Sequence, residues 1–185
     1  MIPKKAKKVF QGIIYSVWQW EQKMFDGSIE TFERLKRCDS VSVIAITPDK
    51  KIIYLEQKQP DQEKAFGSLP GGRIDHLAES SLLAGQRELL EETGYQADNW
   101  KEFSQIQSDH KIERIFWTYI AQGAKKISKQ NLDAGEKIKV KLITLDELLD
   151  LADQKDFRHL DIQVDLVRAK YSKKDYQELK KKLFN

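Results

Sequence analysis

The sequence predicts an α/β fold in which a mixed β-sheet has helices packed on it. Extended, apolar-rich segments occur both before and after a single strongly helical segment near residues 79–93. Helical patterns return only towards the C-terminus. Strands on both sides of one central helix favour a mixed sheet rather than separate all-α and all-β units. At 185 residues the chain suits one domain with appendages.

The first 37 residues are predicted to form a β-hairpin arm. Residues 9–23 are rich in Ile, Tyr, Val and Trp with partial alternation, as in a strand. The sequence Phe-Asp-Gly-Ser at 25–28 favours a tight turn, because Asp-Gly tolerates positive φ, and residues 29–37 return as a second strand. A lone hairpin is not stable in water, so the arm needs another surface. We therefore expect a homodimer that forms through the arm.

The core is predicted over residues 38–155, with C-terminal helices at 156–185 packed on it. Residues 40–47 and 51–58 are apolar strands that flank a Pro-Asp-Lys turn. Leucine spacing indicates the helix at 79–93, and Gly94 stands where a left-handed C-terminal cap belongs. Further strands are expected near 103–107, 114–122 and 138–142, then a helix at 145–152 capped by Thr144, and one or two helices after residue 159.

Composition excludes several classes of protein. The net charge of +3 from 32 basic and 29 acidic residues does not call for a polyanionic partner, and the lysine runs at both ends are typical of solvated termini. We expect no nucleic-acid partner. A single cysteine, no signal peptide and no long apolar run predict a cytoplasmic protein without a membrane span.

Three glutamates share one face of the expected helix. Glu88, Glu91 and Glu92 stand at positions i, i+3 and i+4, where like charges repel. Arg87 can pair with Glu91, which leaves Glu88 and Glu92 for another cation, and clustered hard oxygens are what Mg²⁺ prefers. On their own these glutamates are more typical of a solvated surface helix than of a metal site. The preceding Pro-Gly-Gly break and the terminating Gly94 favour the metal site.

The segment from Gly72 to Tyr95 resembles the Nudix family signature. Glu79 and Arg87 have the required seven residues between them, and Arg-Glu-Leu-Leu-Glu-Glu-Thr-Gly-Tyr matches throughout. One departure is that six residues, not five, separate Gly72 from Glu79. This insertion leaves open whether Gly71 or Gly72 supplies the backbone carbonyl that touches the metal. The resemblance implies an α/β/α sandwich with a mixed sheet.

The resemblance also implies a magnesium-dependent hydrolase, in which Mn²⁺ can substitute. Arg87 would orient the carboxylates, and Glu79 would act at the start of the helix. The general base would come from a later loop, with Glu136 and Glu113 as candidates against a surface-loop alternative for each. The implied metal ligands are Gly72, Glu79, Glu88, Glu91, Glu92 and Glu136.

Beyond this signature the chain resembles the branch of ADP-ribose pyrophosphatases and nucleoside diphosphate sugar hydrolases, which carry a similar hairpin. ADP-ribose enzymes of this branch usually carry a proline in the loop after the signature, whereas this chain has no proline after Pro70. The resemblance therefore favours a nucleotide sugar over ADP-ribose. Cleavage would release a nucleoside monophosphate and a phosphorylated sugar. Trp18 and Trp20 would either stack on a base or pack in an interface, and His110 would contact substrate. Alternatives are a dinucleoside polyphosphate or nucleoside triphosphate hydrolase, or a non-catalytic Nudix sensor.

Overall fold

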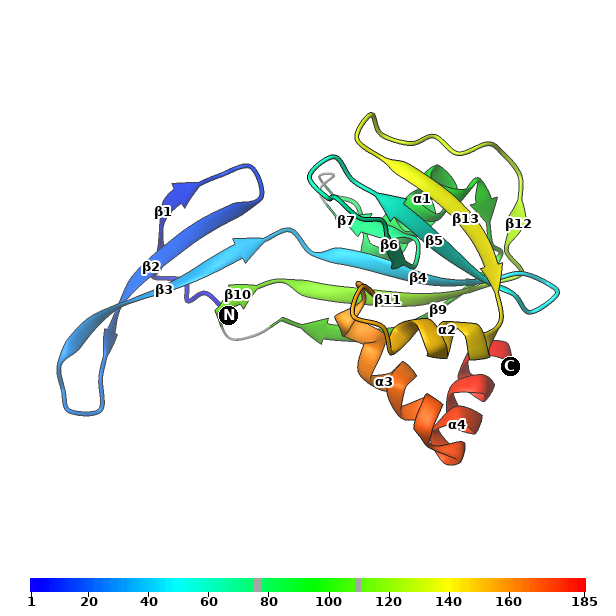
Figure 1. The fold of residues 1–185 in the computed structure, drawn as a ribbon. Helices are drawn as coiled ribbons and strands as arrows, with labels where there is room; N and C mark the ends of the chain where they lie inside the picture. The colour runs from blue at the N-terminus through cyan, green and yellow to red at the C-terminus, as the bar shows by residue number, and fades with distance from the viewer. Residues whose placement is uncertain (75–77, 109–110) are drawn as a thin grey trace.

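The computed structural model describes residues 1–74, 78–108 and 111–185. An extended arm built from the N-terminal strands projects from a body made of one sheet with helices on both faces (Figure 1). The C-terminal helices pack below the sheet in this view, and α1 lies above it. The α/β prediction, with a mixed sheet and an N-terminal arm, is confirmed.

The arm is a sheet of four strands in the order β1-β2-β3-β10. Strands β1 (Lys7–Gln11), β2 (Tyr15–Lys23) and β3 (Ile29–Arg37) run antiparallel, and β10 (Ile112–Glu113) joins β3 in parallel. The expected turn is present, with Gly27 at φ 91°. The prediction of one continuous strand over residues 9–23 is wrong. The Gly12 N–H donates to the Tyr15 carbonyl at 2.8 Å, which closes a turn between β1 and β2.

The body contains a seven-stranded sheet with the path β13-β5-β4-β11-β9. Strands β4 and β11 pair in parallel, while β11 with β9 and β5 with β13 pair antiparallel, so the sheet is mixed. Short strands β6 and β7 attach to β5 and β4, and β8 pairs with β12 apart from the sheet. The strands are β4 (Ser40–Ile46), β5 (Ile52–Lys58), β6 (Phe66–Ser68), β7 (Gly71–Arg73), β8 (Tyr95–Gln96), β9 (Asn99–Gln107), β11 (Ile115–Gln122), β12 (Lys125–Lys126) and β13 (Lys137–Ile143).

Alternation along β4 divides the apolar core into two layers. Val41 and Val43 face α1 (Ser81–Thr93), whereas Ile44 and Ile46 face the C-terminal helices. Successive side chains of a strand point to opposite faces, so one buried strand supplies both layers. The helices on the second face are α2 (Leu145–Ala152), α3 (Leu160–Tyr171) and α4 (Lys173–Phe184).

Capping residues mark the ends of α1 and the start of α2. The Ser80 hydroxyl accepts a hydrogen bond from the Leu83 N–H, and Gly94 ends α1 at φ 75°. A Cβ at Gly94 would lie 2.2 Å from the Ser128 carbonyl oxygen, so only glycine fits there. Thr144 and Glu147 form the capping box of α2. Within the described residues, none of the helices is both long and apolar enough to cross a membrane.

Candidate active site

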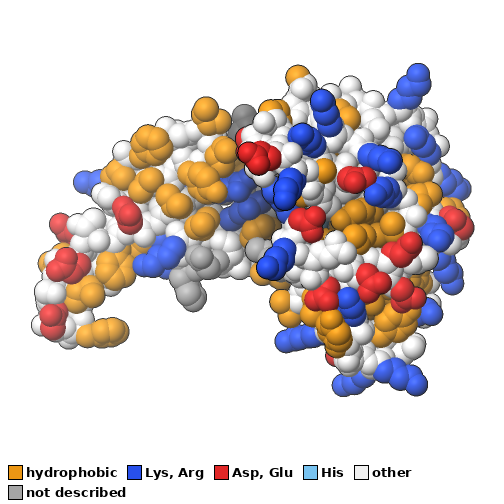
Figure 2. Space-filling model, viewed as in Figure 1, with side chains coloured by type: hydrophobic (Ala, Val, Ile, Leu, Met, Phe, Trp, Pro, Cys, Tyr) orange, Lys and Arg blue, Asp and Glu red, His pale blue; other side chains and the backbone are white. Residues whose placement is uncertain are grey.

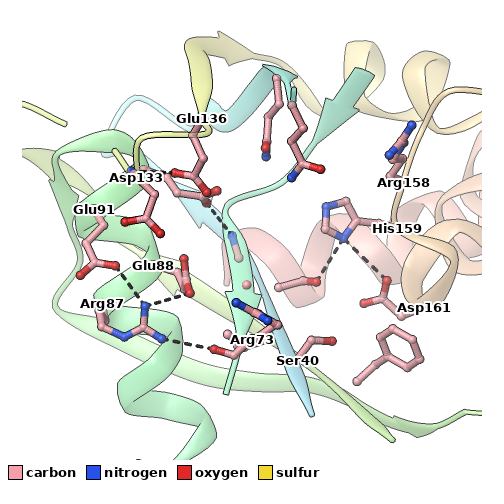
Figure 3. Close-up of a pocket in the computed structure, with 18 of the residues that line it drawn as sticks. Ser40, Arg73, Arg87, Glu88, Glu91, Asp133, Glu136, Arg158, His159 and Asp161 are labelled. Atoms are coloured by element: carbon pink, nitrogen blue, oxygen red, sulfur yellow. Dashed lines mark hydrogen bonds and ion pairs between the residues drawn. The ribbon is translucent and has the colours of Figure 1, made fainter. Parts of the chain in front are cut away.

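A cavity of about 810 Å³ opens where α1, β7, the end of the arm and the start of α3 meet. Carboxylates from α1 and from the loop before β13 stand on one side of it, and Arg158, His159 and Asp161 stand on the other (Figure 3). Its charged lining residues are Arg37, Arg73, Arg87, Glu88, Glu91, Glu92, Arg114, Asp133, Glu136, Arg158 and Asp161, together with His159.

Arg87 holds three of the predicted glutamates in place. Its guanidinium donates to both carboxylate oxygens of Glu79, at 3.0 and 3.2 Å, and to Glu88 at 2.9 Å and Glu91 at 3.0 Å. These ion pairs keep the arginine charged, because they raise its pKa, with the Glu79 hydrogen bond contributing most. Arg87 thus orients the carboxylates, and Glu79 serves here as its partner rather than as part of the cavity lining.

The two glycines of β7 lie against Glu92 and Glu88. The Gly71 N–H donates to Glu92 Oε2 at 2.8 Å. A Cβ on Gly72 would lie 2.3 Å from Glu88 Oε1, so the backbone approaches that carboxylate as only glycine allows. Strand β7 is held at this distance because Gly72 pairs with Val41 and Gly71 pairs with Ser42 of β4. The loop between Gly72 and Glu79 carries the one-residue insertion, and its residues 75–77 lie outside the described residues.

Burial makes the ionised forms of Glu88 and Glu92 costly. Desolvation raises the pKa of Glu88 and raises that of Glu92 well above its usual value, and the charges of Glu91 and Glu136 add to both shifts. A divalent cation would offset this crowding, and the donors are the hard oxygens that Mg²⁺ prefers, so the residues fit such an ion. Among the described residues no three of these side chains converge at coordination distance as they stand. Instead, Glu88 accepts a hydrogen bond from Arg87, and Glu92 accepts one from the Gly71 N–H.

The loop before β13 brings a fourth glutamate to this cluster. Hydrogen bonds from Gln130 to the Glu92 carbonyl (2.6 Å) and from the Asn131 N–H to the Glu91 carbonyl (2.8 Å) fasten the loop to the end of α1. The Glu136 N–H then closes a turn on Asp133 at 2.9 Å. Glu136 lines the cavity and lies close enough to Glu88 and Glu92 to affect their ionisation.

Other predicted site residues lie elsewhere. Glu113 sits on β10, where it accepts from the Ile2 N–H and pairs with Lys36 at 3.5 Å. Trp18 donates to the Ser16 hydroxyl at 3.0 Å, and Trp20 is buried with its ring 6.0 Å from that of Phe32. None of Glu113, Trp18 and Trp20 lines the described cavity. His110 lies outside the described residues.

The segment before α3 contributes a pair that the sequence interpretation left unassigned. The Leu69 N–H donates to His159 Nε2 at 2.8 Å, which fixes the proton of the neutral ring on Nδ1. That nitrogen lies 3.1 Å from the Ser42 hydroxyl and 3.7 Å from Asp161 Oδ1. The buried pair anchors the C-terminal helices to the edge of the cavity. The sequence feature that could have indicated this pair is a histidine and an aspartate two residues apart, His159 and Asp161, at the start of a helix.

The raised pKa values predict how the metal-free protein responds to pH. A carboxyl whose pKa is higher folded than unfolded contributes stability below its unfolded pKa, and this is lost as pH rises through the folded pKa. We therefore expect the urea midpoint of EDTA-treated protein to fall as the pH rises above 4.5, the ordinary pKa of a glutamate. Glu92→Gln, which cannot ionise, should weaken this dependence, and Mg²⁺ should restore more stability at higher pH. Identical pH profiles for the two proteins would contradict the burial argument.

Comparison with known proteins identifies the family. The NUDIX domain model matches residues 36–162. The methanol dehydrogenase activator of Bacillus methanolicus is 29% identical over 153 residues, covering 82% of each chain. The ADP-ribose pyrophosphatase of Bacillus subtilis (strain 168) is 25% identical over 152 residues, covering 81% of this chain and 82% of the relative.

Solved structures share the fold. A structure described as an ADP compounds hydrolase superposes with a TM-score of 0.72 at 21% identity, covering 89% of this chain and 90% of that one. A structure of MutT, from a study of Aliivibrio salmonicida and Vibrio cholerae, gives 0.54 at 18% identity, covering 71% of this chain and 97% of that one. Because the family model spans residues 36–162, well over half of the chain, the protein belongs to the Nudix domain family.

Proposed function

We propose that this protein is a magnesium-dependent hydrolase that cuts the diphosphate bond of a nucleoside diphosphate linked to a sugar, with ADP-ribose among its substrates. The observation that carries the proposal is the cluster of the half-buried Glu88, the buried Glu92 and Glu136 on the same side of the cavity, with two glycines beside the first two. Cleavage by water would release a nucleoside monophosphate and a phosphorylated sugar.

Different residues of the site have different roles in the proposed reaction. Glu88 and Glu92 would hold the metal, which when bound neutralises charge on the diphosphate and acidifies a water molecule. Arg87 keeps Glu88 and Glu91 oriented through its hydrogen bonds at 2.9 and 3.0 Å. We assign the proton-accepting step to Glu136, because it stands in a loop at the cavity rather than in an ion pair.

Two kinds of observation support the substrate class. The ADP-ribose pyrophosphatase of Bacillus subtilis aligns over 81% of this chain, so the comparison reaches beyond the signature helix. The arm is also part of the similarity, since the ADP compounds hydrolase covers 89% of this chain and the shorter MutT structure covers 71%. The name of the Bacillus subtilis relative supports ADP-ribose as a substrate. The absence of proline after Pro70 argues for a nucleotide sugar instead, so both compounds belong to the proposed substrate class.

A substrate panel tests the proposal. The purified protein would be assayed with Mg²⁺ against ADP-ribose, several nucleotide sugars, dinucleoside polyphosphates and nucleoside triphosphates. We expect the highest kcat/KM for a compound in which one diphosphate joins a nucleoside to a sugar. Preference for a triphosphate or a dinucleoside polyphosphate would replace this proposal with the second enzyme class. No turnover of any compound would favour a ligand sensor.

The arm supports a homodimer. Its exposed apolar side chains include Phe10 (59% exposed), Ile13 (99%) and Phe25 (111%), more than a solvated arm of this size would favour. Burying one such side chain in an interface contributes roughly 1.5–3 kcal/mol. We expect the protein to be a dimer at micromolar concentration and the Phe10→Asp/Ile13→Asp double variant to be monomeric, as measured by light scattering.

The matched control for the arm is Val164→Asp, an exposed apolar position (57%) on α3, far from the arm in the sequence. It should remain dimeric. A full-length protein that is monomeric at micromolar concentration would contradict the arm interface, as would a double variant with unchanged mass in solution.

A further inference from the structure

The cavity is lined by charges of both signs. Glutamates of α1 and the Glu136 loop contribute to the lining, and so do arginines from three other segments of the chain. Arg37 comes from the end of β3, Arg114 from the residue before β11, and Arg158 from the approach to α3. Figure 2 shows basic side chains gathered in the hollow where the arm joins the body. Folding has therefore brought together positive charges from distant parts of the chain.

Arg37 and Arg114 are only partly satisfied by the protein. The Nε atom of each is buried, and no described residue accepts a hydrogen bond from it. The Arg37 guanidinium donates to the Tyr15 hydroxyl at the long distance of 3.4 Å. Burial and then the neighbouring charge of Arg37 lower the pKa of Arg114. Its guanidinium lies 4.1 Å from the centroid of the Phe116 ring, which supports it beside the cavity.

The nearby carboxylates are engaged by other groups. Asp39 accepts from the Ile115 N–H at 2.8 Å. Asp161 accepts from the Thr118 hydroxyl at 2.9 Å and pairs with His159 at 3.7 Å. Although burial opposes it, these contacts lower the pKa of Asp161, so it remains an anion held by its own partners. Among the described residues no carboxylate forms an ion pair with Arg37 or Arg114, so the two arginines line the cavity without a counter-ion in direct contact.

The backbone of the arginine pair is displaced along the strands from the position that faces the carboxylates. Gly72, which approaches Glu88, pairs with Val41 of β4. Arg37 precedes Val41 by four residues, and Arg114 lies two residues before Phe116, which pairs with Ser40. At about 3.3 Å per residue, the Cα atoms of Arg37 and Arg114 are roughly 10–13 Å along the strand direction from that of Val41, several times the spacing of two adjacent phosphorus atoms.

We propose that Arg37 and Arg114 form an anion subsite for a third phosphate of the substrate, a phosphomonoester outside the diphosphate that is cut. Guanidinium groups suit this ligand because they donate in pairs to phosphate oxygens. The inference rests on the proposed function and narrows it to nucleoside diphosphate compounds with such an additional phosphate. The phosphate belongs either to the nucleoside ribose or to the linked sugar, and the test separates these two sources.

The test compares three compounds by isothermal titration calorimetry with the full-length protein in EDTA, where the metal-dependent reaction is stopped. They are ADP-ribose, ADP-ribose 2′-phosphate and ADP-ribose 1″-phosphate. We expect one phosphorylated compound to bind about tenfold more tightly than ADP-ribose, as a charge-assisted hydrogen bond contributes. Arg114→Gln should bring that ratio close to one. Arg168→Gln, an exposed control on α3, should preserve it.

Other outcomes overturn the subsite. It is wrong if neither phosphorylated compound binds more tightly than ADP-ribose at up to millimolar concentration. It is also wrong if Arg114→Gln weakens all three compounds equally, since the arginine would then contact a feature they share. Catalysis is judged separately from binding. Failure of the Mg²⁺-loaded protein to cleave any of the three would count against the proposed function, while the binding ratio alone decides the subsite.

Discussion

Glu92→Gln is expected to lower kcat by about a hundredfold or more, because it removes a negative charge from the proposed metal site with little change of shape. The side chain is 4% exposed and accepts from the Gly71 N–H at 2.8 Å, a contact that the glutamine oxygen can keep. The fold should therefore survive, and its metal-free form should be no less stable at neutral pH. Steady-state kinetics at saturating Mg²⁺ and urea unfolding measure the two effects.

The control for this variant is Glu178→Gln on α4, which removes the same charge from a side chain that is 66% exposed. It should retain wild-type turnover. If Glu92→Gln turned over at a near wild-type rate at saturating Mg²⁺, the assignment of Glu92 to the metal would be wrong. A Glu92→Gln protein that fails to fold would instead assign Glu92 a structural role, and Glu88→Gln would then be the variant to measure.

Glu136→Gln is expected to lower kcat by roughly 10²–10⁴-fold at nearly unchanged KM, as removal of a general base does. Glu136 lines the cavity in a loop fastened to α1 through Gln130 and Asn131. Glu113→Gln should have the smaller effect on kcat, because Glu113 is paired with Lys36 at 3.5 Å outside the cavity. The measurement is kcat and KM for both variants across the pH range.

The pH profile distinguishes a base from a residue that only holds the metal. A base produces an acidic limb in the rate profile, and its replacement should abolish that limb. If Glu136→Gln leaves the limb in place, the base lies among the glutamates of α1. If Glu113→Gln is the more damaging change, the two roles are reversed, and Glu113 would have to act away from the cavity described here.

Local signals made α1 and the carboxylate end of the cavity predictable from sequence. Leucine spacing, Ser80 and Gly94 are all short-range, and the structure places the helix at Ser81–Thr93 within two residues of the expected start. The ion pair of Arg87 with Glu91 follows from i, i+4 geometry and is present at 3.0 Å. Helix α2 followed in the same way from its capping residue, Thr144.

The other parts of the cavity could not be predicted from the sequence, because they form through contacts between distant segments of the chain. His159 bonds to Leu69 across 90 positions, and Arg114 meets Arg37 only because β10 adds in parallel to β3. A single sequence gives no register for such pairings. The separate strand β1 was missed because the turn at Gly12 interrupts an otherwise extended pattern. The alternate positions of Trp18 and Trp20 favoured packing over stacking without excluding either, and the structure places both in the arm.

The most direct test of the central claim is product analysis of ADP-ribose incubated with EDTA-treated protein, with and without added Mg²⁺. The carboxylate site should yield AMP and ribose 5-phosphate in equal amounts, at a rate that rises and saturates with Mg²⁺ and is negligible in excess EDTA. Glu92→Gln should show little product at any Mg²⁺ concentration. Undiminished cleavage in EDTA, or release of inorganic phosphate or free adenosine in place of AMP, would contradict the account.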